Sequence, residues 1–286
     1  MEILGTIQKE LKGHNGRILS LALLPNGDLV TGGEDQTINI WDTNNGTVKK
    51  TLTGHTNSIR DLIAIDNNSL ISASFDRTIK IWNINEGTVE KTLTGHSDRV
   101  FALLMLDNGH LVSGSHDKTI KIWNIETGTV KKTLTGQTST VYSLVLLNNG
   151  DLVSGSWDKT IKIWDVESGT VKMSLVGHTG VVYRLTVLDN GDLVSGSVDK
   201  TIKIWNVEDG SVKRTLNGHT QYIFALKVLP NGDLVSGSAD KTIKIWDVET
   251  GTVKKDLNVH STINKFEVLP NGNLISASYE SIIIWD

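Results

Sequence analysis

The chain has 286 residues, with 28 Lys and Arg against 32 Asp and Glu, and its formal net charge at pH 7 is −4. This mildly acidic balance argues against nucleic-acid binding, which usually needs a strong basic excess. The absence of cysteine excludes disulfides, thiolate metal sites and cysteine nucleophiles. No apolar run approaches the ~20 residues of a membrane span, and residues 1–14 lack the features of a signal peptide. We therefore expect an ordered, soluble, cytoplasmic protein.

A repeat of 41 residues runs along the chain. Successive copies of one tryptophan are 41 residues apart in five cases and 39 in the last: Trp41, Trp82, Trp123, Trp164, Trp205, Trp246 and Trp285. Each is followed by Asp or Asn, and each is preceded by a Gly-His pair or a variant of it. A fixed period of this length is typical of repeat architectures, so the whole chain is expected to fold as one domain, residues 1–286.

Each repeat predicts four short strands. In the fifth copy they are residues 181–188, 192–197, 201–205 and 211–216, which are rich in Val, Ile and Thr and separated by Asn-Gly, Asp-Lys and Asp-Gly turns. Seven copies of four strands cannot form one open sheet, because so large a sheet would curl or split. A radial arrangement leaves only short, protected edges.

The Gly-His, Ser-Gly-Ser-x-Asp and Ile-Trp-Asp segments, at this period, resemble those of the WD-repeat β-propeller family. The resemblance covers the whole chain and implies an all-β, seven-bladed propeller of four-stranded antiparallel blades around a central channel. The chain stops at Asp286, after a third strand, and residues 5–11 match the fourth-strand pattern. We expect Gly5–Leu11 to complete the last blade and close the ring.

His, Ser and Asp recur in the repeats and invite comparison with a catalytic triad. A constellation that appears five times with one spacing is better explained by structure. The resemblance implies a buried hydrogen-bond chain from Trp to hydroxyl to His to Asp in each blade. The residues are His14, Thr31, Asp35 and Trp41; His55, Ser72, Asp76 and Trp82; His96, Ser113, Asp117 and Trp123; His178, Ser195, Asp199 and Trp205; His219, Ser236, Asp240 and Trp246.

Two repeats depart from this pattern. The fourth has Gln137 in place of His, and the seventh has Glu280 in place of Asp and two deletions, so we expect the seventh blade to be the softest. Outside the Gly-His positions only His110 and His116 remain, too few for a simple metal site. No phosphate-binding loop or hydrolase motif is present. We predict a protein that is not an enzyme and needs no cofactor.

Three positions of the repeat vary while their neighbours are nearly constant. They are the residue before the turn Asp and the residues three and five after the Gly-His histidine. Of the nine aromatic residues other than the repeat tryptophans, eight fall in these positions. The resemblance places them on one face, around the channel mouth, where such propellers most often bind partners. The expected partner-binding residues are Arg17, Arg60, Phe75, Arg99, Phe101, His116, Tyr142, Trp157, Tyr183, Tyr222, Phe224 and Tyr279.

Aromatic and Arg side chains dominate the energetics of protein interfaces. The leading hypothesis is a monomeric, non-enzymatic scaffold that binds a protein or peptide on this face, with an acidic part of the partner near Arg17, Arg60 and Arg99. Two alternatives remain open. One is a small-ligand or glycan binder, and the other is a recently amplified or engineered propeller with no evolved ligand. Neither nucleic acid nor membrane is expected as a partner.

Overall fold

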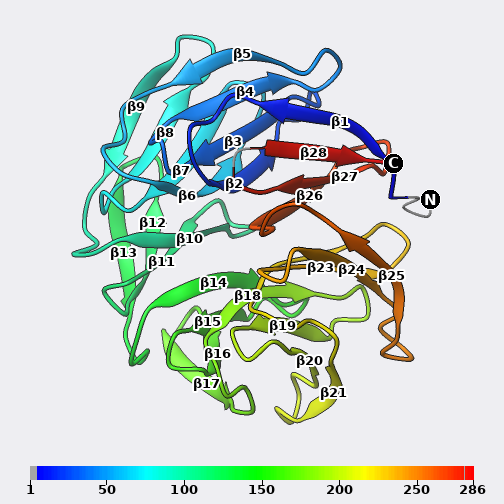
Figure 1. Cartoon of the computed structure of the whole chain (residues 1–286). Coiled ribbons are helices and arrows are strands. Elements are labelled where there is room, and N and C mark those ends of the chain that lie inside the picture. The colour runs from blue at the N-terminus through cyan, green and yellow to red at the C-terminus, as the bar shows by residue number, and fades with distance from the viewer. Residues whose placement is uncertain (1–4, 280) are drawn as a thin grey trace.

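The computed structural model describes residues 5–279 and 281–286, and these residues form seven four-stranded antiparallel sheets. The sheets are the blades of a ring, and Figure 1 shows them following one another in chain order. Blade 1 holds β2 to β5, blades 2 to 6 follow, and blade 7 combines β26, β27 and β28 with β1. The predicted fold, an all-β propeller of seven blades, is confirmed.

Each blade contributes one strand to each of four concentric positions. The innermost strands are β2 (Ile18–Leu23), β6 (Ile59–Ala64), β10 (Val100–Met105), β14 (Val141–Leu146), β18 (Val182–Val187), β22 (Ile223–Val228) and β26 (Lys265–Val268). The second strands are β3 (Leu29–Gly33), β7 (Ser69–Ser74), β11 (Leu111–Ser115), β15 (Leu152–Ser156), β19 (Leu193–Ser197), β23 (Leu234–Ser238) and β27 (Leu274–Ala277).

The third strands carry the repeat tryptophans. They are β4 (Ile38–Asp42), β8 (Ile79–Asn83), β12 (Ile120–Asn124), β16 (Ile161–Asp165), β20 (Ile202–Trp205), β24 (Thr242–Trp246) and β28 (Ser281–Trp285). The outer strands are β5 (Thr47–Leu52), β9 (Thr88–Leu93), β13 (Thr129–Leu134), β17 (Thr170–Leu175), β21 (Val212–Leu216), β25 (Val253–Asn258) and β1 (Ile7–Lys12). The innermost strands of neighbouring blades contact one another, so they line the axis of the ring.

The hydrophobic core lies between the blades. One cluster joins Val30, Ile38 and Leu52 of blade 1 to Leu62 and Trp82 of blade 2, and equivalent clusters follow around the ring. The second strands are buried almost throughout, with Leu and Val followed by small residues such as Ser and Gly, as in β11. The third strands alternate buried Ile and Trp with a partly exposed Lys, as in β12. Because each blade buries its apolar face only against its neighbours, the ring must close to bury all of it.

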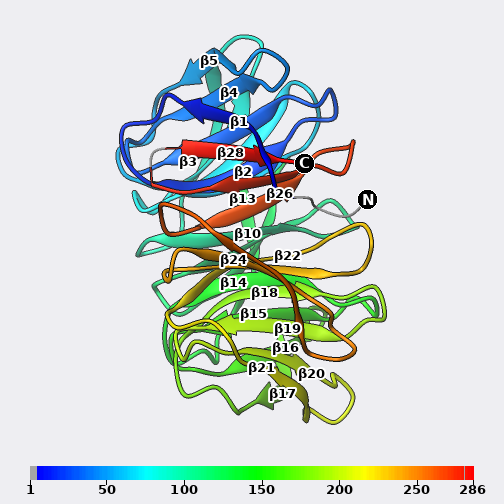
Figure 2. The same ribbon diagram turned by 45° about the vertical axis from the view of Figure 1, so that its right-hand side comes forward.

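Closure takes place in blade 7, where β1 pairs antiparallel with β28, and both views show the two strands side by side (Figures 1 and 2). The predicted closing strand, Gly5–Leu11, is therefore confirmed, with observed bounds Ile7–Lys12. Leu11 is only 1% exposed, and the Asp286 carboxylate accepts a hydrogen bond from the backbone N–H of Thr6 at 2.9 Å. Strand pairing, a side-chain hydrogen bond and burial of Leu11 thus all hold β1 against β28.

Blade 7 has shorter inner strands than the other blades. Its innermost strand, β26, has four residues, where β2 of blade 1 has six, and its second strand, β27, has four, where β3 has five. The predicted departure at Glu280 lies outside the described residues, and the softness of this blade stays a prediction. Among the described residues, no helix is long and apolar enough to cross a membrane.

Candidate functional site

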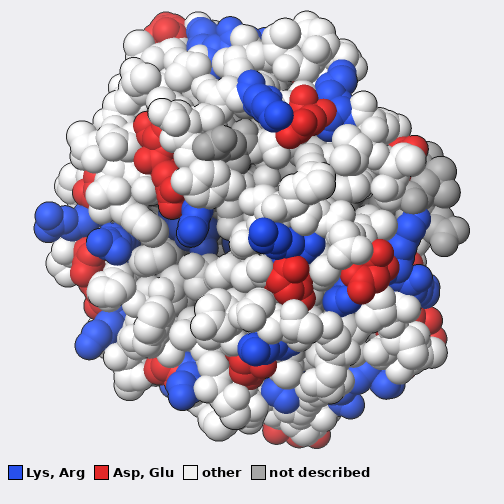
Figure 3. Space-filling model, viewed as in Figure 1, with Lys and Arg blue, Asp and Glu red and all other residues white. Residues whose placement is uncertain are grey.

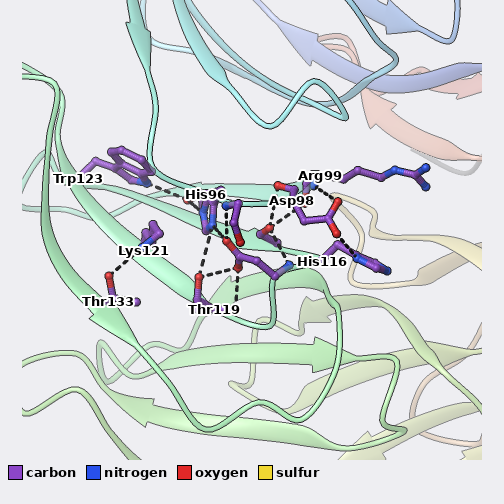
Figure 4. Close-up of polar contacts among 12 residues, drawn as sticks. His96, Asp98, Arg99, His116, Thr119, Lys121, Trp123 and Thr133 are labelled. Carbon is purple, nitrogen blue, oxygen red and sulfur yellow. Dashed lines mark hydrogen bonds and ion pairs between the residues drawn. The ribbon is translucent and has the colours of Figure 1, made fainter.

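The repeated His, Ser, Asp and Trp side chains meet inside the blades, and Figure 4 shows His96 and Trp123 of blade 3 in this arrangement. In blade 3, Trp123 Nε1 donates to Ser113 Oγ at 2.8 Å, Ser113 Oγ lies 2.7 Å from His96 Nε2, and His96 Nδ1 lies 2.8 Å from Asp117 Oδ2. The same chain, which we call the relay, is found in blades 1, 2, 5 and 6, with all three distances between 2.6 and 2.8 Å. The sequence predicted its twenty members, and the structure brings all of them together.

The order of donors in the relay shows why it is structural. Since the indole N–H donates to the hydroxyl oxygen, the hydroxyl proton is directed to His Nε2, and Nδ1–H donates to the carboxylate. The connectivity matches a Ser-His-Asp triad. However, Ser113 is 0% exposed, and its oxygen already accepts the bond from Trp123. No substrate carbonyl can approach such a hydroxyl, so the relay serines cannot act as nucleophiles.

Sequence reasoning missed one member of the relay. The Thr two residues after each relay Asp also donates to that carboxylate, as in the 2.7 Å bond from Thr78 Oγ1 to Asp76 Oδ1. Burial alone would raise the pKa of Asp76, but the bonds from His55 and Thr78 hold it well below its ordinary value. The constant Asp-x-Thr spacing of the repeats was a signal for this bond.

Blades 4 and 7 keep only part of the relay. In blade 4, Gln137 Nε2 donates to Ser154 Oγ at 2.5 Å, and Trp164 donates to the same oxygen at 2.8 Å. Gln137 Oε1 is buried and has no hydrogen-bond partner among the described residues. In blade 7, Trp285 donates to Ser276 at 2.8 Å. The predicted interruption at Gln137 therefore leaves a buried acceptor unsatisfied.

The three variable columns lie next to one another on one face. In blades 1 to 6 the backbone N–H of the residue before the turn Asp donates to the backbone carbonyl of the residue three after the Gly-His histidine or Gln137, at 2.9–3.0 Å, as from Trp157 to Thr140. The residue five after the Gly-His histidine occupies a β-bulge of the innermost strand in blades 1 to 6, since the register of each of these strands shifts around it. A bulge re-aims its side chain out of the normal alternation. It turns Phe101, Tyr142, Tyr183 and their equivalents toward the channel mouth.

The aromatic side chains form a continuous band along this mouth. Ring centroids are 4.6–4.8 Å apart from Phe75 to Phe101, then Tyr142, Tyr183 and Phe224. Phe101 and Tyr142 are only 7% exposed, and burial together with the nearby Tyr183 raises the pKa of Tyr142 to about 12. These two side chains are therefore buried, because the rings pack on one another.

Arg60 also differs from the expectation of an outward-facing cation. It is 6% exposed, and its guanidinium lies 5.9 Å from the Phe101 ring and 5.6 Å from the Tyr183 ring. Arg17 and Arg99 are exposed and contact Tyr279 and Phe75, at 5.8 and 5.2 Å. Since Arg60 is held inside the band, only two of the three predicted arginines are exposed at the mouth.

The exposed part of the face contains three large aromatic side chains: Trp157 at 54%, Tyr279 at 48% and Tyr222 at 43%. His116 beside them is exposed and pairs with Asp98 at 2.8 Å (Figure 4). The mouth encloses a cavity of about 360 Å³ whose lining includes Arg17, Arg60 and Tyr279. All twelve predicted partner-binding residues therefore lie on or within one mouth, in either an exposed or a buried layer.

A second group of residues was not predicted. One position of the innermost strands follows the bulge directly in blades 1 to 6 and opens β26 in blade 7, and it holds Ser20, Asp61, Ala102, Ser143, Arg184, Ala225 and Lys265. Five of them line the central channel: Asp61, Ala102, Ser143, Arg184 and Lys265. Three of these seven are charged. The signal was available in the same comparison of repeats that revealed the three columns. The described residues hold no cluster of three or more His, Cys, Asp or Glu that could bind a metal ion.

A family model supports the assignment of the repeats. The model described as WD domain, G-beta repeat, matches residues 5–42, 46–83, 87–124, 128–165, 169–206 and 210–247. Each match joins one outer strand to three strands of the next blade, as in β1 with β2, β3 and β4. No curated protein matches the chain. The family's propellers are commonly protein-interaction scaffolds. Because the six matches cover more than half of its length, the chain belongs to the WD40 repeat family.

Proposed function

We propose that this propeller is a non-enzymatic scaffold that binds a protein or peptide on the face around the channel mouth. The observation that carries the proposal is the exposure of Trp157, Tyr222 and Tyr279 around a band of packed aromatic rings. A contiguous exposed apolar patch is unusual on a monomer unless it binds something, and rigid aromatic anchors are typical of interface hot spots. Residues 1–286 would act as one monomeric domain in the cytoplasm.

Trp157 is well suited to be an anchor. Its ring stacks on Tyr142 with centroids 6.0 Å apart, so its orientation is restricted before a partner arrives. The other seven tryptophans are 3% exposed or less. Blades 5 and 6 hold Val198 and Ala239 at the same place, so the fold does not need an aromatic ring there. A side chain dispensable for the blade supports a role in binding.

Charge on the surface is compatible with a protein partner. Lysines, arginines and carboxylates are interspersed on the face seen in Figure 3. Along the outer strands, Lys49 and Lys172 pair with Asp28 and Asp151 at 2.7 and 2.6 Å. Paired charges near exposed edges discourage sheet-to-sheet association. We therefore propose neither nucleic acid nor membrane as a partner.

The test compares the proteins that the native ring and the Trp157→Ala variant capture from a lysate of the source cells. The substitution gives blade 4 the residue that blade 6 has at this position, Ala239. Loss of a hot-spot aromatic weakens binding by ~2 kcal/mol or more, so the partner should be lost from the variant. Val176→Thr is the matched control, since Val176 is 74% exposed and other blades have Thr at its place. A bound partner should also shield Trp157 fluorescence from acrylamide. Equal capture by the native ring and Trp157→Ala would contradict the proposal.

A further inference from the structure

The central channel contains a group of charged side chains that the mouth does not use. Its cavity, of about 460 Å³, is lined by residues from all seven innermost strands. Asp61, Arg184 and Lys265 stand where the other four blades have Ser or Ala. Lys227 lies two residues after Ala225 in β22, and Glu267 lies two residues after Lys265 in β26. Charged side chains that are buried along a channel require partners, because desolvation costs several kcal/mol per ion.

Both carboxylates of this cavity are already paired with lysines. Asp61 Oδ1 lies 3.0 Å from Lys265 Nζ, and Glu267 Oε1 lies 2.6 Å from Lys227 Nζ. Asp61 Oδ2 accepts a further bond from the backbone N–H of Leu103 at 2.9 Å. Burial alone would raise the pKa of Asp61, but Lys265 and Arg184 keep it below its ordinary value. These four side chains therefore neutralise one another.

Arg184 has no such counterion within 4.0 Å among the described residues. Its Nε donates to the backbone carbonyl of Phe224 at 3.2 Å, while Nη2 is buried and has no hydrogen-bond partner in the described part of the chain. Burial and the nearby Arg60 lower its pKa to about 10, so it remains charged at neutral pH. Arg60 contributes a second guanidinium whose contacts are aromatic rings and a backbone carbonyl.

We propose that the central channel binds one small oxyanion, a phosphate or a carboxylate, through the guanidinium of Arg184. A planar guanidinium binds such anions through two parallel N–H bonds, which would give Nη2 its missing acceptor. The anion would also reduce the repulsion between Arg184 and Arg60. The oxyanion is either a free ion or an acidic side chain that a partner inserts from the mouth. This inference does not depend on the proposed function, since Trp157 takes no part in it.

The experiment titrates the full chain with sodium phosphate and with sodium acetate by calorimetry, at an ionic strength held constant with sodium chloride. The expected result is one site per chain, with affinity at least about tenfold weaker in Arg184→Ser, as for loss of a charge-assisted hydrogen bond. Blades 1 and 4 already hold Ser at this place, so the variant should fold. Tighter binding of phosphate would identify a phosphate site, as for a free ion, and tighter binding of acetate would identify a carboxylate site, which an acidic side chain of a partner can also occupy.

Arg214→Met is the matched control, because it removes one arginine from the outer strand and gives it the residue that blade 4 has there, Met173. Its anion affinity should equal that of the native chain. Asp61→Ser should bind phosphate more tightly, since it frees Lys265 for the anion. Absence of phosphate and acetate binding to the native chain would overturn the proposal. So would equal affinity in Arg184→Ser and Arg214→Met, with folding of both checked by circular dichroism.

Discussion

The contribution of the relay to stability can be tested by exchanging the Gln and His residues that different blades carry at the same relay position. Blade 4 has Gln137 where blade 5 has His178, and the two relays share no residue. Gln137→His should complete the relay of blade 4 and stabilise the fold. His178→Gln should reproduce the defect in blade 5 and destabilise it. The neighbouring relay residues are a Trp, a Ser and an Asp in both blades, so the exchange changes one group in a matched environment.

The expected magnitude follows from the hydrogen bonds that each exchange forms or breaks. His178 lies 2.7 Å from the Asp199 carboxylate, and a hydrogen bond to a charged group contributes about 1.5–3 kcal/mol. Gln137 lacks this bond and buries Oε1 without a partner, which costs about 1–3 kcal/mol. Partial hydration of the carboxylates reduces both figures. We expect His178→Gln to lower the free energy of unfolding by about 2–4 kcal/mol and Gln137→His to raise it by a similar amount.

The assay is equilibrium unfolding in guanidinium chloride, followed by fluorescence of the buried tryptophans. The change should appear in the midpoint with little change in slope, because neither variant alters the surface exposed on unfolding. The double variant should return close to the native value, since effects at sites without shared partners add. A Gln137→His chain no more stable than the native one would refute the idea that the relay stabilises each blade.

Two further predictions concern acid and ring closure. Hydrogen bonds from His and Thr outweigh burial and depress the pKa of the relay aspartates below 3.8, and burial lowers that of His219 below 6.5. In both cases the unfolded chain binds more protons, so unfolding free energy should start to fall below pH ~6.5 and fall steeply below ~4, measured by denaturant titration at each pH. A constant value down to pH 3 would contradict this. Leu11→Ala should lower the free energy of unfolding by about 2–5 kcal/mol, as should Leu52→Ala in β5, because each side chain is 1% exposed. A negligible loss of unfolding free energy for Leu11→Ala alone, measured by denaturant titration, would mean that β1 does not pack on blade 7.

Sequence periodicity was sufficient to predict the blades, because each short strand is specified by its own residues and by the turns that bound it. The closing strand was predictable for the same reason, since residues 5–11 repeat the pattern of the other outer strands. The relay could be placed because five blades repeat it with one spacing. Its threonine was overlooked although the constant Asp-x-Thr spacing marked it, because a single hydroxyl at a turn is common and only the comparison of repeats singles it out.

The arrangement of the mouth could not be predicted, because it depends on the β-bulges. A bulge changes the face of the sheet on which a side chain lies, and the alternation of apolar and polar residues in the sequence does not predict where a bulge occurs. Arg60 was therefore expected to be exposed, although it is buried between Phe101 and Tyr183. The packing of one ring on the next likewise requires the curvature of the whole ring, which brings side chains about 41 residues apart into contact.

The bulges also explain why the mouth and the channel vary together. In an ordinary strand, neighbouring residues face opposite sides, but the bulge lets two consecutive residues approach the axis. Tyr183 joins the aromatic band while Arg184 lines the channel, and Arg60 and Asp61 are divided in the same way. A partner that moves Arg60 would therefore alter the field at Arg184, whose pKa Arg60 already lowers. The aromatic face at the mouth and the proposed oxyanion site in the channel use different side chains, but these side chains are consecutive residues of the same strands.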